Sequence, residues 1–129
     1  MSRVQRISAA AIIINNEKIL LARYKSPASR DNKTFLVGPG GGVNESESLE
    51  DTVIREVFEE TALLIAPRNM MLVEDLLSKQ CRMVKVWFFC QLTGGALRET
   101  DGTKKEGILA VRGFSREELE REIVFPTLV

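Results

Sequence analysis

The sequence contains no histidine and only two cysteines, and both features exclude kinds of chemistry. Without imidazole, Ser-His-Asp catalysis, Cys-His catalysis and histidine-liganded zinc are ruled out. Cys81 and Cys90 do not form a Cys-x-x-Cys pair, and two cysteines cannot build a multi-bridge disulfide scaffold. Any chemistry must rely on carboxylates, Arg, Lys, Tyr, the backbone or a metal ion, and we expect a reducing, cytoplasmic setting.

The chain also lacks an excess of charge and a long hydrophobic run. Its 18 basic and 18 acidic residues balance, so stable nucleic-acid binding through a strongly basic surface is not expected. There is no stretch of about 18 apolar residues and no signal-peptide pattern, which argues against a membrane span. The length of 129 residues, with 44% hydrophobic and 28% charged, predicts one globular domain over residues 1–129.

Apolar runs that alternate with turn residues predict the order of the secondary-structure elements. Strands are expected at residues 6–14, 18–24, 34–37, 70–77, 83–92 and 108–114. The Asn15-Asn16 turn joins the first two strands into a hairpin, and Ser115 begins a short helix over residues 116–122. Irregular segments are expected at residues 25–33, 38–42 and 96–105, the last of them mobile. Strands interleaved with helices indicate an α/β sandwich.

A further helix is predicted after the glycine-rich segment, and it carries three glutamates close together. Ser48 is a favourable N-cap, and Pro67 requires the helix to end before it. Placing successive residues about 100° apart puts Glu56, Glu59 and Glu60 within one arc of about 100°. Glu60 also falls at the border of the apolar stripe, where a purely solvated face would not place a carboxylate.

Three carboxylates this close repel one another unless a positive charge lies among them. Oxygen ligands favour Mg²⁺ or Mn²⁺, and the lack of histidine and clustered cysteine argues against zinc. The glycines let the backbone approach a ligand closely, and the N–H groups near a helix start favour anions such as phosphate. Glu-x-x-Glu-Glu alone is also typical of a solvated helix face, but the full spacing from Gly41 through Glu47 and Arg55 is uncommon.

The segment from Gly41 to Leu63 resembles the signature box of the Nudix hydrolases, Gly-x5-Glu-x7-Arg-Glu-hydrophobic-x-Glu-Glu-x-Gly-hydrophobic. The Gly38-Pro39-Gly40-Gly41 segment and the order of elements are similar to that family as well. The resemblance implies an α/β/α sandwich with a mixed sheet. It also implies Mg²⁺- or Mn²⁺-dependent hydrolysis of a nucleoside diphosphate linked to another group. Ala62 stands where the family has its final box glycine, which leaves the geometry of the following turn open.

The resemblance also implies roles for individual residues. The positions that match the family's metal ligands are Gly41 (through its carbonyl), Glu56, Glu59 and Glu60. Arg55 and Glu47 match the pair that orients this cluster. The family often adds an acidic residue from outside the box, for which Glu106 is our choice, with Glu99 and Asp101 as alternatives. All three positions also fit an ordinary charged loop.

In the implied mechanism a water molecule attacks a phosphorus of the diphosphate, with the metal neutralising the phosphate oxygens. The residue that accepts the proton of the water is Glu56, Glu59 or Glu106. The expected substrate contacts are Arg23, Gly40 and Gly41. An arginine at the end of a strand is, however, also typical of an exposed surface. The aromatic candidates for stacking on a base are Tyr24, Phe35, Trp87 and Phe89, of which the last two fit the core better.

The expected partner is a small-molecule nucleotide, and the sequence does not identify which one. The second hypothesis is a Nudix-fold binding or regulatory module with little activity. Only Ala62 and the short C-terminus favour it, and the three retained glutamates speak against it. Dimers are common among relatives, so the apolar segment Ile123–Phe125 fits a homodimer interface as well as a cover for the core.

Overall fold

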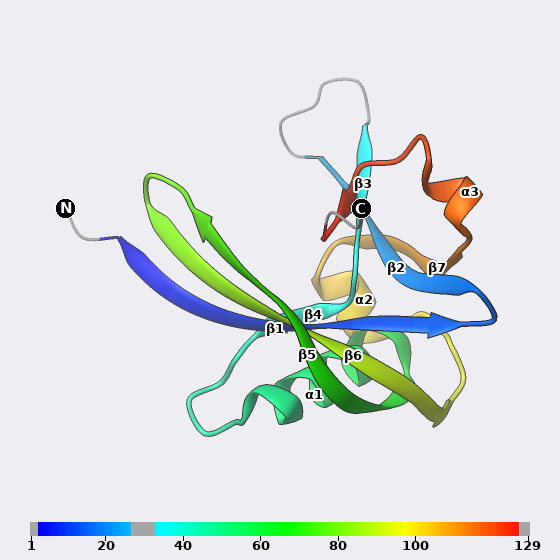
Figure 1. Ribbon diagram of the computed structural model, residues 1–129, viewed down its shortest axis with the longest axis horizontal. Helices are drawn as coiled ribbons and strands as arrows, with labels where there is room; N and C mark the ends of the chain where they lie inside the picture. Colours follow the sequence, from blue (N-terminus) through cyan, green and yellow to red (C-terminus); the bar gives the residue numbers. More distant parts are fainter. Residues whose placement is uncertain (1–2, 27–32, 127–129) are drawn as a thin grey trace.

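Figure 1 shows the computed structural model of the protein, which describes residues 3–26 and 33–126. Within these residues, eight strands form a mixed sheet in the order β5-β6-β1-β2-β3-β8, with β4 paired to β1 and β7 to β2. The strands are β1 Val4–Asn15, β2 Lys18–Lys25, β3 Thr34–Val37, β4 Gly40–Gly42, β5 Leu63–Leu77, β6 Cys81–Gly95, β7 Ile108–Phe114 and β8 Val124–Phe125. The helices are α1 Leu49–Thr61, α2 Asp101–Lys105 and α3 Arg116–Leu119.

The central strand β1 carries core residues on both of its faces, because it runs parallel to β6 and is covered on both sides. The cluster on the α1 side includes Ala9, Ala11, Ile13, Val53, Val57 and Phe88. The cluster on the other face includes Ala10, Ile12, Leu21, Leu36 and Trp87. The α1-side cluster packs α1 against the sheet and thereby sets the orientation of the helix face that carries the glutamates.

The α/β architecture with a mixed sheet is as predicted, and two local predictions are confirmed. The β1–β2 hairpin closes with Asn15 opposite Lys18, while Asn16 and Glu17 adopt φ angles of 52° and 61°. The N-cap of α1 is Ser48, whose hydroxyl accepts a hydrogen bond from the Asp51 backbone N–H at 3.1 Å. Among the described residues, no helix is long and apolar enough to cross a bilayer.

The prediction that residues 38–42 have no regular structure is wrong for Gly40–Gly42, which forms β4. This strand pairs antiparallel with β1, so that Ser8 faces Gly42 and Ala10 faces Gly40. The packing leaves no room for a side chain, because a Cβ on Gly40 would lie 2.5 Å from the Ala10 Cβ. Glycine opposite alanine therefore permits a strand that neither residue would favour by propensity.

The strand predicted over residues 70–77 begins earlier, because β5 starts at Leu63 directly after α1 and runs through Pro67. Proline is accommodated because β5 is an edge strand of the sheet, and the register shifts between Pro67 and Asn69. Its partner β6 extends beyond the predicted 83–92 at both ends.

The prediction that 96–105 is a mobile loop is wrong for its second half, where α2 lies. The helix is short, but Thr100 and Thr103 close a capping box at its N-terminus. The last helix, α3, ends at Leu119 rather than at residue 122. In the C-terminal tail, β8 pairs parallel to β3, with Leu36 opposite Val124. Most of the predicted loop 25–33 lies outside the described residues.

Candidate active site

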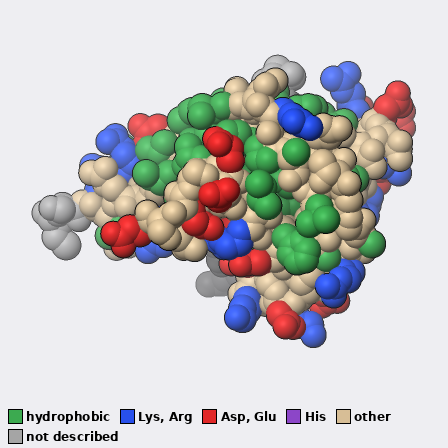
Figure 2. Space-filling view, turned by 90° about the horizontal axis from the view of Figure 1, so that it is seen from below, with side chains coloured by type: hydrophobic (Ala, Val, Ile, Leu, Met, Phe, Trp, Pro, Cys, Tyr) green, Lys and Arg blue, Asp and Glu red, His purple; other side chains and the backbone are tan. Residues whose placement is uncertain are grey.

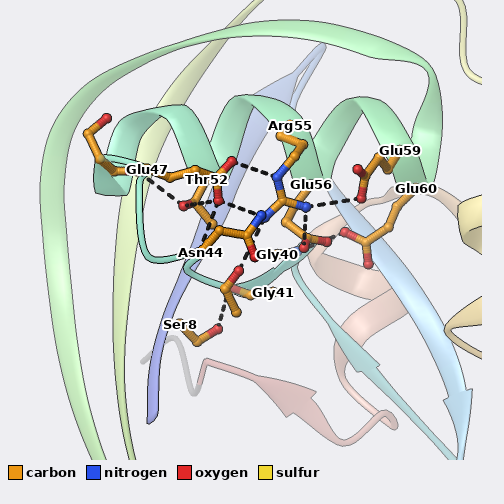
Figure 3. A network of polar contacts seen from close by, with 12 residues as sticks. Ser8, Gly40, Gly41, Asn44, Glu47, Thr52, Arg55, Glu56, Glu59 and Glu60 are labelled. Atoms are coloured by element: carbon orange, nitrogen blue, oxygen red, sulfur yellow. Dashed lines mark hydrogen bonds and ion pairs between the residues drawn. The ribbon is translucent and has the colours of Figure 1, made fainter.

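The three glutamates lie on the C-terminal half of α1, and Gly40 and Gly41 of β4 lie below the helix in the view of Figure 3. Glu60 is 1% exposed and Glu56 8% exposed, so two of the three carboxylates are buried. Glu59 is the open one, with half of its side chain exposed to solvent. The structure thus brings together on one patch the three residues whose spacing predicted it.

Arg55 is the centre of a network that connects these carboxylates (Figure 3). Its Nε and Nη2 donate to the two oxygens of Glu47 at 2.6 and 2.9 Å, which is a bidentate pair. Its Nη1 donates to Glu56 at 2.9 Å and to Glu59 at 3.2 Å, and Nη2 also reaches the Gly42 carbonyl at 3.2 Å. One guanidinium therefore fixes three carboxylates and the end of β4.

Glu47 is the most firmly held of these acids. Its bond to Arg55, together with the Asn44 backbone N–H at 3.1 Å and the Thr52 hydroxyl at 3.0 Å, lowers the pKa of Glu47 to about 2. Glu47 therefore stays charged at all physiological pH values. Glu47 in turn raises the pKa of Arg55, so both side chains stay charged. Their ion pair holds the segment before α1 against the helix.

Glu60 has the opposite electrostatics. Burial raises its pKa to about 8, and the nearby charges of Glu56 and Glu106 add to the shift. Within residues 3–26 and 33–126, its carboxylate accepts hydrogen bonds from the Gly40 backbone N–H at 3.0 Å and from the Tyr24 hydroxyl at 3.4 Å. Burial also raises the pKa of Glu56, against the stabilising effect of Arg55 on its charge. Burial and mutual repulsion therefore disfavour the charged forms of both Glu56 and Glu60.

Of the three loop acids considered from the sequence, Glu106 is the one that the structure brings to this cluster. It follows α2, and its charge raises the pKa values of Glu56, Glu60 and Tyr24. The other two acids, Glu99 and Asp101, line an open cavity of about 640 Å³ beside Glu59 and Phe58.

Gly41 lies against the cluster, as the sequence predicted for a close backbone approach. A Cβ at this position would meet the carboxylate of Glu56 at 2.5 Å. The Gly41 carbonyl accepts a hydrogen bond from the Ser8 hydroxyl at 3.0 Å. Sequence reasoning missed Ser8, a buried polar residue whose only signal was its place next to the apolar run of the first strand.

Sequence reasoning also missed the connection between α2 and α1. The Thr103 hydroxyl is buried and donates to the Glu60 carbonyl at 2.8 Å, and the Thr100 hydroxyl donates to the Glu59 carbonyl. Gly102 packs directly on the backbone of Glu59. The segment that carries Glu106 is therefore attached to the backbone of two of the clustered glutamates.

The structure does not bring Arg23 to the glutamates. Its guanidinium donates to Glu122 at 2.5 and 3.2 Å and to the Thr34 hydroxyl at 2.6 Å. The neighbouring Tyr24 ring stacks on Phe35, with the ring centroids 5.5 Å apart. Of the other aromatic candidates, Trp87 is completely buried in the core and Phe89 is half-buried, which agrees with the core interpretation.

The donors of the glutamate cluster match a metal ion in their chemistry but are not arranged around one. No three Asp, Glu or Cys side chains in the described ranges stand ready-arranged around an ion, because Arg55 now occupies the space between Glu56 and Glu59. The chemistry of the donors nevertheless fits a hard divalent cation: they are carboxylate oxygens, and burial of Glu56 and Glu60 disfavours their charge unless a cation offsets it.

Comparisons with known proteins agree with this geometry. The NUDIX domain profile matches residues 4–127. The ADP-ribose pyrophosphatase of Methanocaldococcus jannaschii is 29% identical over 101 residues, which make up 77% of this chain and 58% of that protein. The chain thus spans less than two thirds of this curated relative.

Solved structures share the fold. A MutT protein from Methanosarcina mazei Go1 has a TM-score of 0.74 at 26% identity, covering 96% of this chain and 87% of that one. A NUDIX hydrolase from Nitrosomonas europaea has a TM-score of 0.74 at 24% identity, covering 92% and 77%. Because the profile match covers nearly the whole chain and includes the glutamate cluster, this protein belongs to the Nudix hydrolase family.

Proposed function

We propose that the protein is a divalent-metal-dependent hydrolase that cleaves the diphosphate bond of a nucleoside diphosphate linked to another group. The observation that carries this proposal is the convergence of Glu56, Glu59 and Glu60 beside the Gly41 backbone, with Arg55 between them. Two of these carboxylates are buried next to each other. A purely structural helix face has no reason to bury like charges together.

The residues that would hold the cation are Gly41, through its carbonyl, and Glu56, Glu59 and Glu60. When bound, Mg²⁺ or Mn²⁺ neutralises phosphate oxygens and lowers the pKa of a water molecule. Arg55 bonds to both Glu47 and the Gly42 carbonyl, and these bonds hold α1 and β4 in fixed positions relative to each other. The proton acceptor is Glu56, Glu59 or Glu106, and Glu106 approaches from α2 while Arg55 holds the other two.

The nucleotide would bind at the open side of this cluster. The Gly40 and Gly41 backbone is the phosphate-facing element, because glycines allow phosphate oxygens to approach closely. The stacked rings of Tyr24 and Phe35 form the best-placed platform for a base, since the Tyr24 hydroxyl reaches Glu60. Arg23 becomes a phosphate contact only by giving up its bonds to Glu122. The two cysteines are free thiols, which fits a reducing cytoplasmic setting.

The alternative function is a regulatory module with little activity, and the conformation of Ala62 does not favour it. Ala62 adopts a φ of 66°, the left-handed conformation that a glycine would take at this helix end. Ala62 thus adopts the turn that a glycine would allow, and Glu56, Glu59 and Glu60 converge in its presence.

The experiment is a hydrolysis assay with Mg²⁺ and then Mn²⁺ on ADP-ribose, nucleoside triphosphates, dinucleoside polyphosphates and nucleotide sugars. ADP-ribose is the first substrate to test, because the relative from M. jannaschii is named for its hydrolysis. Glu60→Gln removes one clustered carboxylate, and Glu50→Gln makes the same change at an exposed position of the same helix. We expect turnover of one substrate class, abolished only by Glu60→Gln.

Two results would contradict the proposal. Equal turnover in the wild type and Glu60→Gln would show that the cluster is not the active site. Binding of metal and nucleotide without any turnover across the panel would instead establish the regulatory module.

A further inference from the structure

Glu74 and Lys85 carry opposite charges and face each other across two strands without bonding. The register pairs Glu74 of β5 with Lys85 of β6, so both side chains lie on the same face of the sheet. Instead of forming an ion pair, both side chains contact Trp87. Glu74 Oε1 accepts a hydrogen bond from the indole N–H at 2.6 Å, and the Lys85 ammonium lies 4.6 Å from the ring centroid. Trp87 thus keeps the carboxylate and the ammonium apart.

Each member of this pair has bonding capacity that the protein itself does not use. Within residues 3–26 and 33–126, no donor bonds to Oε2 of Glu74, and no acceptor bonds to the three ammonium N–H groups of Lys85. Lys85 is nevertheless partly buried, and burial lowers its pKa, while the charges of Glu74 and Glu60 act in the opposite direction. A partly desolvated ammonium without an acceptor is unfavourable. The pair therefore presents a hydrogen-bond acceptor and a donor side by side to a ligand.

Apolar side chains surround the pair on the same face of the sheet. Leu72 and Leu76 lie two positions to either side of Glu74 on β5, and they are 38% and 45% exposed. Met83, which pairs with Leu76, precedes Lys85 on the same face of β6 and is partly buried. We call these five residues the floor. Small-molecule sites combine an apolar lining with a few polar groups that fix the orientation of the ligand, and the floor has this composition.

The floor lies on the sheet face opposite α1, because Trp87 belongs to the core cluster on that face. In Figure 1 this part of β5 and β6 curls away from α2 and α3, and the exposure of Leu72 and Leu76 agrees with this position. Figure 2 shows the α1 side of the molecule, where acidic side chains gather near the middle of the face. A ligand can therefore approach the floor from the side of the sheet that α1 does not occupy.

The floor is connected to the glutamate cluster through β1 and β4. The register places Gly42, Ser8 and Lys85 in one row across β4, β1 and β6. Neighbouring strands are about 4.8 Å apart, so this row spans about 10 Å from the glycine backbone to Lys85. Ser8, in the middle of the row, donates to the Gly41 carbonyl. A nucleoside attached to a diphosphate that lies on β4 is long enough to reach the floor.

The floor and the aromatic platform of Tyr24 and Phe35 border the same carboxylate. Gly38, just before β4, packs on the Trp87 ring so closely that a Cβ would lie 2.6 Å from it. The charge of Glu60 acts on Lys85, and the Tyr24 hydroxyl reaches the same carboxylate from β2. A base held by its face on the platform therefore has the polar pair within the same region for its edge.

From this arrangement we propose that Glu74 and Lys85 select the base of the substrate and favour a base with an exocyclic amino group. The inference rests on the proposed hydrolysis of a nucleoside diphosphate derivative and adds which bases are accepted. Glu74 accepts a hydrogen bond from the amino group, and Lys85 donates to the ring nitrogen beside it, a pattern that adenine and cytosine offer. The charges of the pair sum to zero, which suits an uncharged base better than a phosphate.

Two matched pairs of nucleotides test the selection: ADP against inosine diphosphate, and CDP against UDP. In hypoxanthine and uracil a carbonyl oxygen replaces the amino group and would face the carboxylate, which has no proton to donate. Titration calorimetry in Mg²⁺ measures the affinities. We expect the wild type to bind the amino-bearing member of at least one pair about tenfold or more tightly, the usual effect of a hydrogen bond to a charged group.

Glu74→Gln keeps an oxygen for the indole of Trp87 but presents N–H groups to the base. We expect the preference for the amino-bearing nucleotide to fall to about twofold or less, because the amide can also donate to a carbonyl. The matched control is Asp75→Asn, since Asp75 is the next residue of β5 and its side chain lies on the other face. This control should keep the preference of the wild type.

Lys85→Met removes the donor and gives a second, independent test. The binding of the preferred nucleotide should weaken by about tenfold, and its carbonyl-bearing partner should be affected less. Lys79→Met, in the turn between β5 and β6, is the matched control. An equal loss for all four nucleotides in Lys85→Met would overturn the proposal, since the lysine would then contact the phosphates or the ribose.

Equal affinity of the wild type for both members of each pair would also overturn the proposal, as would an unchanged preference in Glu74→Gln. These titrations need no turnover, so they are independent of the hydrolysis assay. A hydrolase without base preference would keep the proposed function and lose this inference. Base selection through Glu74 in a protein without turnover would do the reverse.

Discussion

Gly41 and Gly42, at the end of β4, have different structural roles, although neither has a positive φ. At Gly41 the backbone approaches Glu56 so closely that a Cβ would lie 2.5 to 2.7 Å from the carboxylate atoms. At Gly42 a Cβ would meet no atom within 4 Å. The need for glycine at position 41 is thus steric and is directed at a single carboxylate.

This contrast leads to a prediction at residue scale. Gly41→Ala should push the Glu56 carboxylate out of position and lower kcat/KM by about tenfold or more, because reacting groups tolerate little displacement. Gly42→Ala should keep kcat/KM within about twofold of the wild type, within the usual effect of a surface change. Steady-state kinetics on the best substrate of the panel measures both. Equal losses in the two variants would contradict the steric role of Gly41.

A second prediction at this scale concerns the fork of donors on Arg55. Arg55→Lys keeps the positive charge but cannot bond to Glu47 in a bidentate way and also reach Glu56 and Glu59. We expect kcat/KM to fall by about tenfold to a hundredfold, as for other residues that orient metal ligands. Arg116→Lys is the matched control, because Arg116 is exposed on α3. Unchanged kinetics in Arg55→Lys would show that charge alone suffices.

At the scale of the elements, the C-terminal end of α1 has every one of its last four carbonyl groups bonded. The Phe58 carbonyl accepts from the Ala62 backbone N–H and the Thr61 carbonyl from the Arg98 backbone N–H. The two carbonyls between them accept from the hydroxyls of Thr100 and Thr103. The last three of these carbonyls have no partner inside the helix, so the segment before β7 completes the helix that carries the glutamates.

Removing one of these hydroxyls tests the attachment. Thr103→Val is nearly isosteric but leaves the buried Glu60 carbonyl without its donor, so the free energy of unfolding should fall by about 1–2 kcal/mol. The displaced backbone of Glu60 should also lower kcat. Urea denaturation and kinetics measure the two effects, and Thr103→Ser, which retains the hydroxyl, should recover most of both. Failure of Thr103→Ser to recover kcat would assign the loss to packing instead.

The left-handed residue at this helix end gives a further prediction. An L-residue in this conformation costs roughly 1 kcal/mol or more relative to glycine. Ala62→Gly should therefore raise the free energy of unfolding, by about 0.5–1 kcal/mol once the greater freedom of glycine in the unfolded chain is subtracted. Ala66→Gly, in the ordinary strand β5, should lower it by about the same amount. A loss of stability in Ala62→Gly, measured by urea denaturation, would contradict the strain argument.

How well each element was predicted depends on where its stabilisation comes from. The helix α1 and the β1–β2 hairpin rest on local signals, and the sequence identified the Ser48 cap and the hairpin, although the turn lies at Asn16-Glu17, one residue later than predicted. The glycine strand β4 exists only because the alanines of β1 leave space for it, a tertiary effect with no local signal. The helix α2 is too short to form alone and is held by its attachment to α1.

At the scale of the whole molecule, the same distinction separates the parts of the candidate site. The glutamate cluster lies within a single helix, so its spacing alone predicts that the carboxylates converge. Ser8 and Tyr24 come from distant strands and reach the cluster only through the register of the sheet. Glu106 was predicted because it stands where a polar segment returns to a strand, which is a weaker signal. The pairing of Arg23 with Glu122, 99 positions apart, had no signal at all.

The buried carboxylates also set how the stability of the whole molecule depends on pH. Glu60 has a pKa of about 8 in the folded protein against 4.5 for an ordinary glutamate. The unfolded chain therefore loses this proton at lower pH than the folded protein does. The protonated Glu60 therefore makes its full contribution to the free energy of unfolding below about pH 4.5, and this contribution is lost as the pH rises towards 8. Glu47, whose pKa is lowered to about 2, acts with the opposite sign and only below about pH 4.5.

Without divalent cations, the free energy of unfolding of the wild type should therefore fall by about a few kcal/mol between about pH 5 and pH 8. Glu60→Gln has no proton to lose at this position, so its stability should change much less over this range and exceed that of the wild type near pH 8. Addition of Mg²⁺ should stabilise the wild type most at high pH, where binding requires the charged glutamate and the cation offsets its burial. Urea denaturation at several pH values, in EDTA and in Mg²⁺, measures all three curves. If Glu60→Gln retained the full pH dependence of the wild type in EDTA, another buried group would be responsible for that dependence. Glu56 would then be the next residue to replace.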